Sequence, residues 1–207
     1  MTVPTLALNE RVIDHSRDVL SFALAKRGVG FDDETQSWLD LHYSYPVEDL
    51  TFGGLLAHHA LARAIIPARM SASRNRLLRL AAAHPDLADA YNDRAAVYGE
   101  CQRTFDPWTA VQLEATRRGE AIELLSRLER HLADGRLVLI PPAYGAADIV
   151  WTVFLARMAF VGMEEEVLSR PALAQYWRAV QSRPSFMVAD VWTKLHAGRL
   201  IAGILLG

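Results

Sequence analysis

The chain has 207 residues, of which 51% are hydrophobic and 22% are charged, and its formal net charge is −2 at pH 7. This length and composition suffice for one large domain, or one domain plus a fragment, with a real core. The small net charge gives no drive toward nucleic acid or an anionic membrane, so we expect neither as a partner. A single cysteine, Cys101, excludes an internal disulfide, CxxC redox chemistry and a multi-cysteine zinc site.

The ends of the chain show no targeting or membrane-spanning segment. No basic stretch followed by an apolar one marks a secretory signal at the start. The longest nearly uncharged apolar run, residues 145–156, contains Asp148. It is also shorter than the roughly 20 residues that a spanning helix needs. We therefore expect a cytoplasmic protein without a membrane span.

The first 30 residues combine strand-like and helical patterns. Two short β-type runs, residues 5–8 and 11–14, are separated by two residues, which favours a hairpin. Ser16 is placed to cap a helix whose apolar residues recur at helical spacing, and Gly28 can stop that helix. The sequence thus predicts a β-β-α unit at the start.

From Asp33 onward the pattern is helical, with prolines and glycines between the helices, and Asp33 is expected to cap the first of them. The only shift in composition lies near residues 31–32, where we place a boundary between segments 1–31 and 32–207. We expect Pro67 to end one helix, and we expect a long helix that Asp106 caps, with Pro107 at its first position, and that Gly135 ends. The expected helices cover about residues 33–44, 47–66, 72–83, 85 to beyond 98, 107–133, 145–162, 171–182 and the region after 184.

Residues near the start carry a resemblance to the glutathione S-transferase family. Residues 3–6 (Val-Pro-Thr-Leu) are similar to the family segment that holds a cis proline beside the cysteinyl part of glutathione. Ser16 matches the family serine that receives the γ-glutamyl carboxylate, and a helix N-terminus suits such an anion on physical grounds. His15 departs from the usual acidic or amide residue. The resemblance implies that glutathione is bound by Val3, Pro4, His15 and Ser16.

A second motif, residues 144–149, resembles the folding motif of the same family. In that motif Asp148 bonds back to the N–H of the residue at position 145, so we expect Asp148 to be structural. Together the motifs imply a mainly-α fold. It consists of the all-α C-terminal helical domain of glutathione transferases, preceded by a partial thioredoxin-like β-hairpin and helix. Extra length around residues 67–105 is similar to insertions in relatives of the tetrachlorohydroquinone reductive dehalogenases and of the ganglioside-induced differentiation-associated proteins.

The resemblance implies a reaction in which glutathione, as co-substrate, attacks a small hydrophobic electrophile, and it implies a homodimer. Conjugation and reductive removal of a group are both open. The family's thiol-activating residue precedes the matched segment, so we expect no catalytic residue in this chain and leave its enzymatic activity undecided. The chain would then be a fragment or carry a late-assigned start, be completed by another polypeptide, or be a degenerate relative. The alternative function is a non-catalytic binding or interaction module using the helical domain.

Several side chains allow both a functional and a structural interpretation. Four residues are candidates for the electrophile pocket, or else pack against the hairpin and its helix: Trp38, His42, Tyr43 and Tyr45. Adjacent His58 and His59 diverge by about 100° on a helix, so we expect no metal site. Residues 50–85 contain no acidic residue. The arginines of that stretch either hold an anionic ligand or form a solvated face paired with Glu114, Glu120 or Glu123: Arg63, Arg69, Arg74, Arg76 and Arg79.

Overall fold

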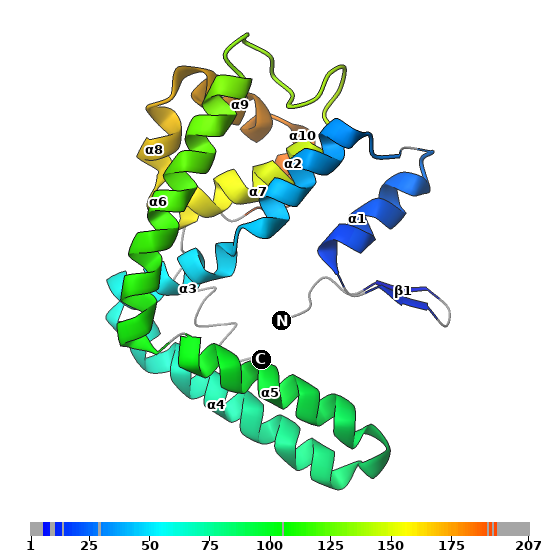
Figure 1. Ribbon diagram of the computed structural model, residues 1–207, viewed down its shortest axis with the longest axis vertical. Helices are drawn as coiled ribbons and strands as arrows, with labels where there is room; N and C mark the ends of the chain where they lie inside the picture. The colour runs from blue at the N-terminus through cyan, green and yellow to red at the C-terminus, as the bar shows by residue number, and fades with distance from the viewer. Residues whose placement is uncertain are drawn as a thin grey trace. The chain divides into compact units, whose positions relative to one another are not determined.

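The computed structural model of the chain describes residues 6–8, 11–13, 15–28, 30–104, 106–189, 191 and 193. Helices make up most of this part of the chain (Figure 1), which confirms the predicted mainly-α fold. The elements are β1 (Leu6–Leu8), β2 (Arg11–Ile13), α1 (Ser16–Ala25), α2 (Asp33–Ser44), α3 (Val47–His58), α4 (Ala60–Ala83), the 3-10 helix η1 (Pro85–Leu87), α5 (Ala88–Thr104), α6 (Pro107–His131), α7 (Ala146–Phe160), α8 (Glu164–Leu168), α9 (Pro171–Gln181) and α10 (Pro184–Val188).

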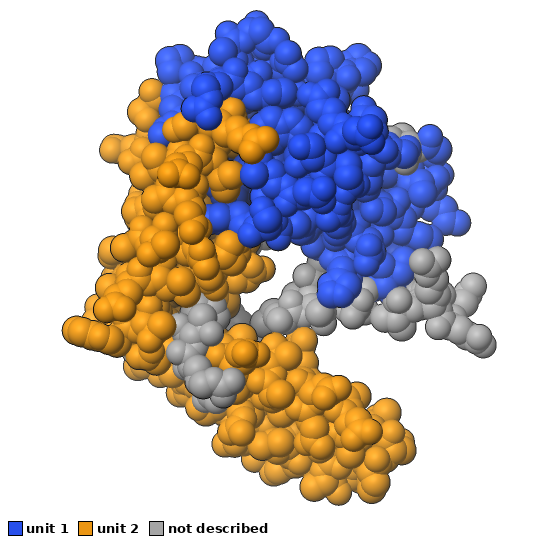
Figure 2. Space-filling model, in the orientation of Figure 1, with its two compact units in different colours: residues 1–45, 129–156, 170–191 blue, residues 46–128, 157–169, 192–207 orange. Residues whose placement is uncertain are grey.

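The chain divides into two compact units (Figure 2). Unit 1 contains residues 1–45, 129–156 and 170–191, and unit 2 contains residues 46–128, 157–169 and 192–207. Helices α6 and α7 each contribute residues to both units. The boundary expected between residues 31 and 32 stays a prediction.

Unit 1 begins with the predicted β-β-α order. Strands β1 and β2 pair antiparallel, with Leu6 opposite Ile13; the two expected turn residues lie outside the described ones. Helix α1 begins at Ser16, so the prediction that Ser16 is the cap was wrong by one position. His15 takes that place because its backbone is extended (φ −106°, ψ 134°), whereas Ser16 is already helical. Gly28, which follows α1, has the positive φ of 70° that favours glycine.

Helix α2 shows the same one-residue difference at its start. Asp32, and not Asp33, is the cap, and its carboxylate accepts a 2.7 Å hydrogen bond from the backbone N–H of Thr35. A capping oxygen reaches the N–H three residues on, and Asp32 has the required extended backbone (φ −78°, ψ 171°). The side chain and then the backbone N–H of Thr35 favour the ionised form, so the pKa of Asp32 lies below its usual value.

Large aromatic side chains form the core of unit 1. The Trp151 indole N–H donates a 3.2 Å hydrogen bond to the backbone carbonyl of Trp38, and the two rings meet edge to face at 5.6 Å. Such an arrangement suits aromatic quadrupoles and adds to the stabilisation from burial. Four aromatic residues of this core are almost completely buried: Trp151, Phe154, Tyr176 and Trp177.

Asp148 is buried within this core with full hydrogen bonding. One carboxylate oxygen accepts from the backbone N–H of Leu139 (2.8 Å) and from the Tyr176 hydroxyl (2.9 Å). The other accepts from the backbone N–H of Gly145 at 2.9 Å, so the predicted bond back to position 145 is present. Burial raises the pKa of Asp148, and the three donors oppose that change. Asp148 therefore joins a loop, the start of α7 and α9.

In unit 2 the expected helix over 47–66 is wrong. Helix α3 ends at His58, and His59 has an extended backbone (φ −127°, ψ 106°) before α4 begins. Pro67 lies inside α4 and does not end a helix. A proline removes the hydrogen bond to the carbonyl four residues earlier. The helix continues past it because α4 packs against α5, beside which it lies in Figure 1.

The α4–α5 hairpin buries mainly small side chains. Its buried residues are Ala62 and Ala81 on α4 and Ala95 on α5, whereas Leu61 is 55% and Val97 42% exposed. Where α3, α4, α5 and α6 meet, a small apolar cluster forms from Leu56, Ala110, Phe52, Ile66, Met70 and Cys101. Among the helices described by the structure, none is long and apolar enough to cross a membrane.

Helix α6 begins and ends as the sequence predicts. The Asp106 carboxylate accepts from the backbone N–H groups of Trp108 (3.1 Å) and Thr109 (3.3 Å), which caps the helix. Its pKa is lowered by these bonds. Beyond the last turn Gly135 has a φ of 82°, the left-handed conformation expected of a glycine after a helix.

Candidate functional site

The start of α1 places two of the predicted glutathione-binding residues. Val3 and Pro4 lie outside the described residues. His15 and Ser16 stand at the N-terminus of α1, both with exposed side chains. The Ser16 hydroxyl donates a long 3.4 Å hydrogen bond to the phenolic oxygen of Tyr43. The structure thus brings a predicted glutathione-binding residue next to a predicted electrophile-binding one.

A charged pair lies beside this contact. Arg17 donates to the carboxylate of Asp40 at 2.6 Å, and its guanidinium lies 5.8 Å from the centre of the Tyr43 ring. Arg17 therefore links α1 to α2 next to Ser16. An exposed pair of this kind contributes little to stability, about 0–1 kcal/mol, but it fixes a cation near the helix N-terminus.

The four predicted electrophile-binding residues fall into two pairs. Trp38 and Tyr45 are 7% and 8% exposed and pack in the core of unit 1, where their rings meet those of Trp151 and Phe154 of α7. His42 and Tyr43 are only partly buried, and Tyr43 contacts Ser16 of α1. A role of the four in binding an electrophile stays a prediction, and the geometry favours His42 and Tyr43 for it.

His42 has an unusual electrostatic environment. Its ring meets those of Tyr43 (4.9 Å) and Trp151 (5.7 Å) edge to face. Its Nδ1 atom is buried and has no hydrogen-bond partner among the described residues. Burial lowers the pKa of His42 from 6.5 to about 4, so the imidazole is neutral at pH 7. It is a polar group with unused hydrogen-bonding capacity next to Tyr43.

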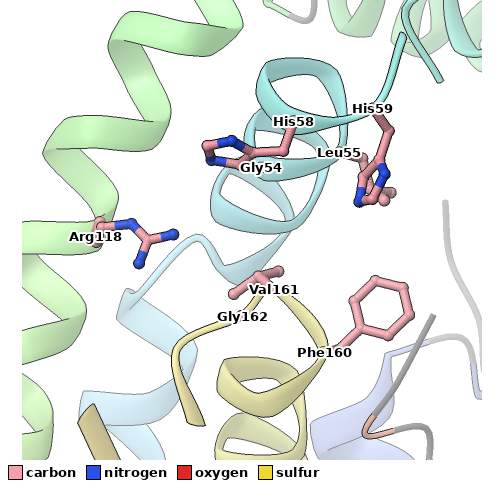
Figure 3. Close-up of a pocket in the computed structure, with 8 residues that line it drawn as sticks. All are labelled: Gly54, Leu55, His58, His59, Arg118, Phe160, Val161 and Gly162. Atoms are coloured by element: carbon pink, nitrogen blue, oxygen red, sulfur yellow. The ribbon is translucent and has the colours of Figure 1, made fainter. Parts of the chain in front are cut away.

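A second candidate site, not predicted from the sequence, is a pocket of about 430 Å³ within unit 2 (Figure 3). Of its lining residues, the sequence singles out only the pair His58 and His59, and only as possible metal ligands. Among the described residues, no group of three or more His, Cys, Asp or Glu side chains is placed to hold a metal ion. The pocket is lined by Gly54, Leu55, His58, His59, Arg118, Phe160, Val161 and Gly162.

Polar side chains from α3 and α6 face one another in this pocket. Figure 3 shows the His58 imidazole and the Arg118 guanidinium directed toward each other. Arg118 donates from Nε to the Glu114 carboxylate at 3.0 Å, and His58 Nε2 lies 3.8 Å from the same oxygen. Glu114 is only 7% exposed. The buried carboxylate therefore holds the arginine in position.

One of two adjacent glycines allows α3 and α6 to approach closely. A Cβ atom on Gly53 would lie 2.8 Å from Glu114 Cβ and 2.9 Å from the carbonyl oxygen of Ala110. On Gly54 it would lie 3.7 Å from the nearest atom, on Val161, which is ordinary contact. Gly53 is thus required for helix packing, whereas Gly54 leaves part of the pocket open.

Two acidic residues of α6, Glu114 and Glu120, pair with arginines of the same helix. Arg117 donates to Glu120 at 2.8 Å and to Asp49 of α3 at 3.1 Å, and Glu114 accepts from Arg118. From the sequence, Glu114 and Glu120 are possible partners for the arginine-rich stretch of α4. These bonds join them to arginines of α6 instead. Nearby arginines on the same helix compete successfully because residues three and four apart lie side by side.

Comparison with known proteins gives two informative relatives. The chain is 28% identical over 205 residues to the tetrachloro-p-hydroquinone reductive dehalogenase of Sphingobium chlorophenolicum. The aligned region covers 95% of this chain and 77% of the relative. It is 34% identical over 106 residues to the glutathione S-transferase TCHQD of Arabidopsis thaliana, covering 49% and 37% respectively. No family model matches the chain, and no solved structure matches it significantly. These relatives confirm the resemblance to the glutathione S-transferase family that the sequence motifs carry.

Proposed function

We propose that this protein uses glutathione as a co-substrate to act on a small hydrophobic electrophile, by conjugation or by reductive removal of a group. The observation that carries the proposal is the similarity to a reductive dehalogenase along 95% of the chain. A second relative is named as a glutathione S-transferase. The β-β-α order with Ser16 at the start of α1 agrees with this family relation.

In this proposal the γ-glutamyl carboxylate of glutathione binds at the N-terminus of α1. The first N–H groups of a helix have no partner within the helix, and the helix dipole favours an anion there. Ser16 adds a hydroxyl whose present bond to Tyr43, at 3.4 Å, is long and exposed. A carboxylate can replace it with a shorter, charge-assisted bond. Val3, Pro4 and His15 complete the proposed contacts to glutathione.

The proposed chemistry is attack by the glutathione thiolate on an electrophilic carbon. A thiol with a pKa of about 8.5 is mostly protonated at pH 7, so its ionised form must be stabilised for the attack. In conjugation a C–S bond forms while the leaving group departs with the electron pair. His42, neutral at pH 7, and Tyr43 offer polar contacts for the electrophile. We assign no residue of the chain to the ionisation of the thiol.

Calorimetric titration of the full chain with glutathione tests the binding step. We expect binding, and we expect Ser16→Ala to weaken it about tenfold, because a hydrogen bond to a charged group contributes about 1.5–3 kcal/mol. Ser21→Ala is the matched control, since the Ser21 hydroxyl donates to the carbonyl of Arg17 in the middle of the same helix. Equal losses for both variants, or no binding by a folded chain, would contradict the proposal.

Turnover and assembly need separate measurements. Halide release from a chlorinated aromatic compound in the presence of glutathione reports the reaction. Glutathione binding without turnover would favour a non-catalytic binding module. We also propose that the protein is a homodimer, as is usual in the family, and sedimentation equilibrium measures this directly.

A further inference from the structure

We propose that the pocket of unit 2 is a second ligand site, which binds a small organic carboxylate with an aromatic or aliphatic body. It is separate from the proposed glutathione site, which contains no residue of the pocket. All eight lining residues belong to unit 2. Its volume of about 430 Å³ is within the range of pockets that hold small molecules.

Arg118 supplies the anchor for the carboxylate. Its Nε donates to Glu114, and its two Nη groups have no partner among the described residues. An arginine held in this way presents the planar pair of donors that matches a carboxylate. The Arg118 side chain is 33% exposed, whereas the Glu114 side chain taken alone is 10% exposed, and Glu114 does not line the pocket. A ligand thus meets the cation and not the anion behind it.

Two imidazoles also line the pocket. His58 and His59 come from the last turn of α3 and from the break that follows it. Figure 3 shows His58 on the side of Arg118 and His59 on the other side, beside Leu55, and each imidazole can offer a ring N–H donor. No carboxylate is among the lining residues. The polar side therefore favours an anionic group over a cationic one.

The remaining lining residues suit an apolar body. Leu55, Phe160 and Val161 are hydrophobic, and Figure 3 shows the Phe160 ring on the side of the pocket away from Arg118. Gly54 and Gly162 add no side-chain volume. A ring or short chain against these residues removes apolar surface from water while its carboxylate meets Arg118. This division of polar and apolar sides specifies an amphipathic anion.

Binding of naphthalene-2-carboxylate to the full chain, followed by calorimetry, tests the proposal. The neutral probe naphthalene-2-carboxamide has the same size and no charge. We expect saturable binding of the carboxylate to the unaltered protein. The carboxamide should bind the unaltered protein at least about tenfold more weakly, and the carboxylate should bind Arg118→Gln at least about tenfold more weakly, because charge-assisted hydrogen bonds are lost in both cases. Gly54→Val keeps every charge but fills the pocket, and we expect it to abolish binding. Arg76→Gln, an exposed arginine of α4, is the matched control and should bind normally.

Removal of Arg118 alone leaves the buried Glu114 without its cation, which can impair folding. The double variant Glu114→Gln/Arg118→Gln avoids this problem, and it should bind as weakly as the single variant. Binding unchanged in the double variant or in Gly54→Val would overturn the proposal. So would equal affinity for the carboxamide, or no saturable binding below about 1 mM, which corresponds to about −4 kcal/mol. Ser16→Ala should leave this site unaffected, so the failure of one proposal is distinguishable from the failure of the other.

Discussion

The centre of unit 1 and the α4–α5 hairpin of unit 2 are stabilised in different ways. In unit 1, Trp151 and Tyr176 are completely buried around a carboxylate, Asp148, that accepts three hydrogen bonds. In the hairpin, the buried residues are alanines, and several larger side chains remain exposed. The first region depends on specific partners, and loss of any of them is costly. The second depends on helix length and backbone hydrogen bonding, so it should tolerate substitution.

The largest expected effect comes from Asp148→Ala. The change leaves two backbone N–H groups and the Tyr176 hydroxyl without their acceptor in a buried site. We expect the free energy of unfolding to fall by about 3–5 kcal/mol, measured by urea denaturation. Asp134→Ala is the control, because this exposed aspartate pairs with Arg136 at the surface. Similar losses for both variants would show that the buried network is not what distinguishes unit 1.

The next effect concerns the close approach of α3 and α6. Gly53→Ala places a Cβ atom 2.8 Å from Glu114 Cβ, and neither neighbouring atom is the end of a flexible side chain. We expect a loss of about 1–3 kcal/mol, typical of overpacking. Gly54→Ala has only ordinary contacts. It should stabilise α3 by up to about 1 kcal/mol, because alanine favours a helix over glycine. Opposite signs in thermal unfolding would confirm the helix contact.

His42 should make the stability of unit 1 depend on pH. Its pKa is about 4 in the folded protein and 6.5 in the reference state, so between these values the unfolded chain binds a proton that the folded chain does not. Stability is therefore complete above pH 6.5 and falls as the pH decreases toward 4. We expect this loss to be about 2 kcal/mol. His42→Phe should remove it, which urea unfolding at pH 7 and pH 4.5 can measure. An identical pH profile in the variant would contradict the assignment.

Pro67→Ala should give the smallest effect, in the opposite direction. The substitution restores a hydrogen bond inside α4, where an interior proline costs up to about 3 kcal/mol relative to alanine. Proline also restricts the unfolded chain, which offsets part of that gain. We expect a net stabilisation of about 1 kcal/mol. A destabilised variant would mean that α4 is shaped by the proline and is less tolerant than its small buried residues indicate.

Local features of the fold were predictable, because they depend on a few neighbouring residues. The bond from Gly145 to Asp148, the cap at Asp106 and the positive φ values at Gly28 and Gly135 all follow from short motifs. The break at His59 was not predictable, since histidine neither ends helices nor favours turns strongly. The prediction that Pro67 ends a helix was wrong because the packing of α4 against α5 outweighs the tendency of proline to break a helix.

The candidate sites were predictable only in part. Ser16 and Tyr43 were both singled out from the sequence, but their contact joins residues 27 positions apart. The pocket combines residues of α3, α6 and the end of α7, and Arg118 has no local pattern that sets it apart from its neighbours. Likewise, the missing partner of His42 Nδ1 is a property of three-dimensional packing. Such features require knowledge of which distant segments meet.

The division of unit 1 into three separate stretches of the chain has a consequence for folding during synthesis. Residues 1–45 belong with residues 129–156 and 170–191, so the contact of α2 with Trp151 spans 113 positions. The α4–α5 hairpin, by contrast, closes within about 45 residues. Local contacts form faster than distant ones. On the ribosome the hairpin is therefore expected to form first. The aromatic surface of α2 stays uncovered until more than half of the chain has been synthesised and α7 can pack against it.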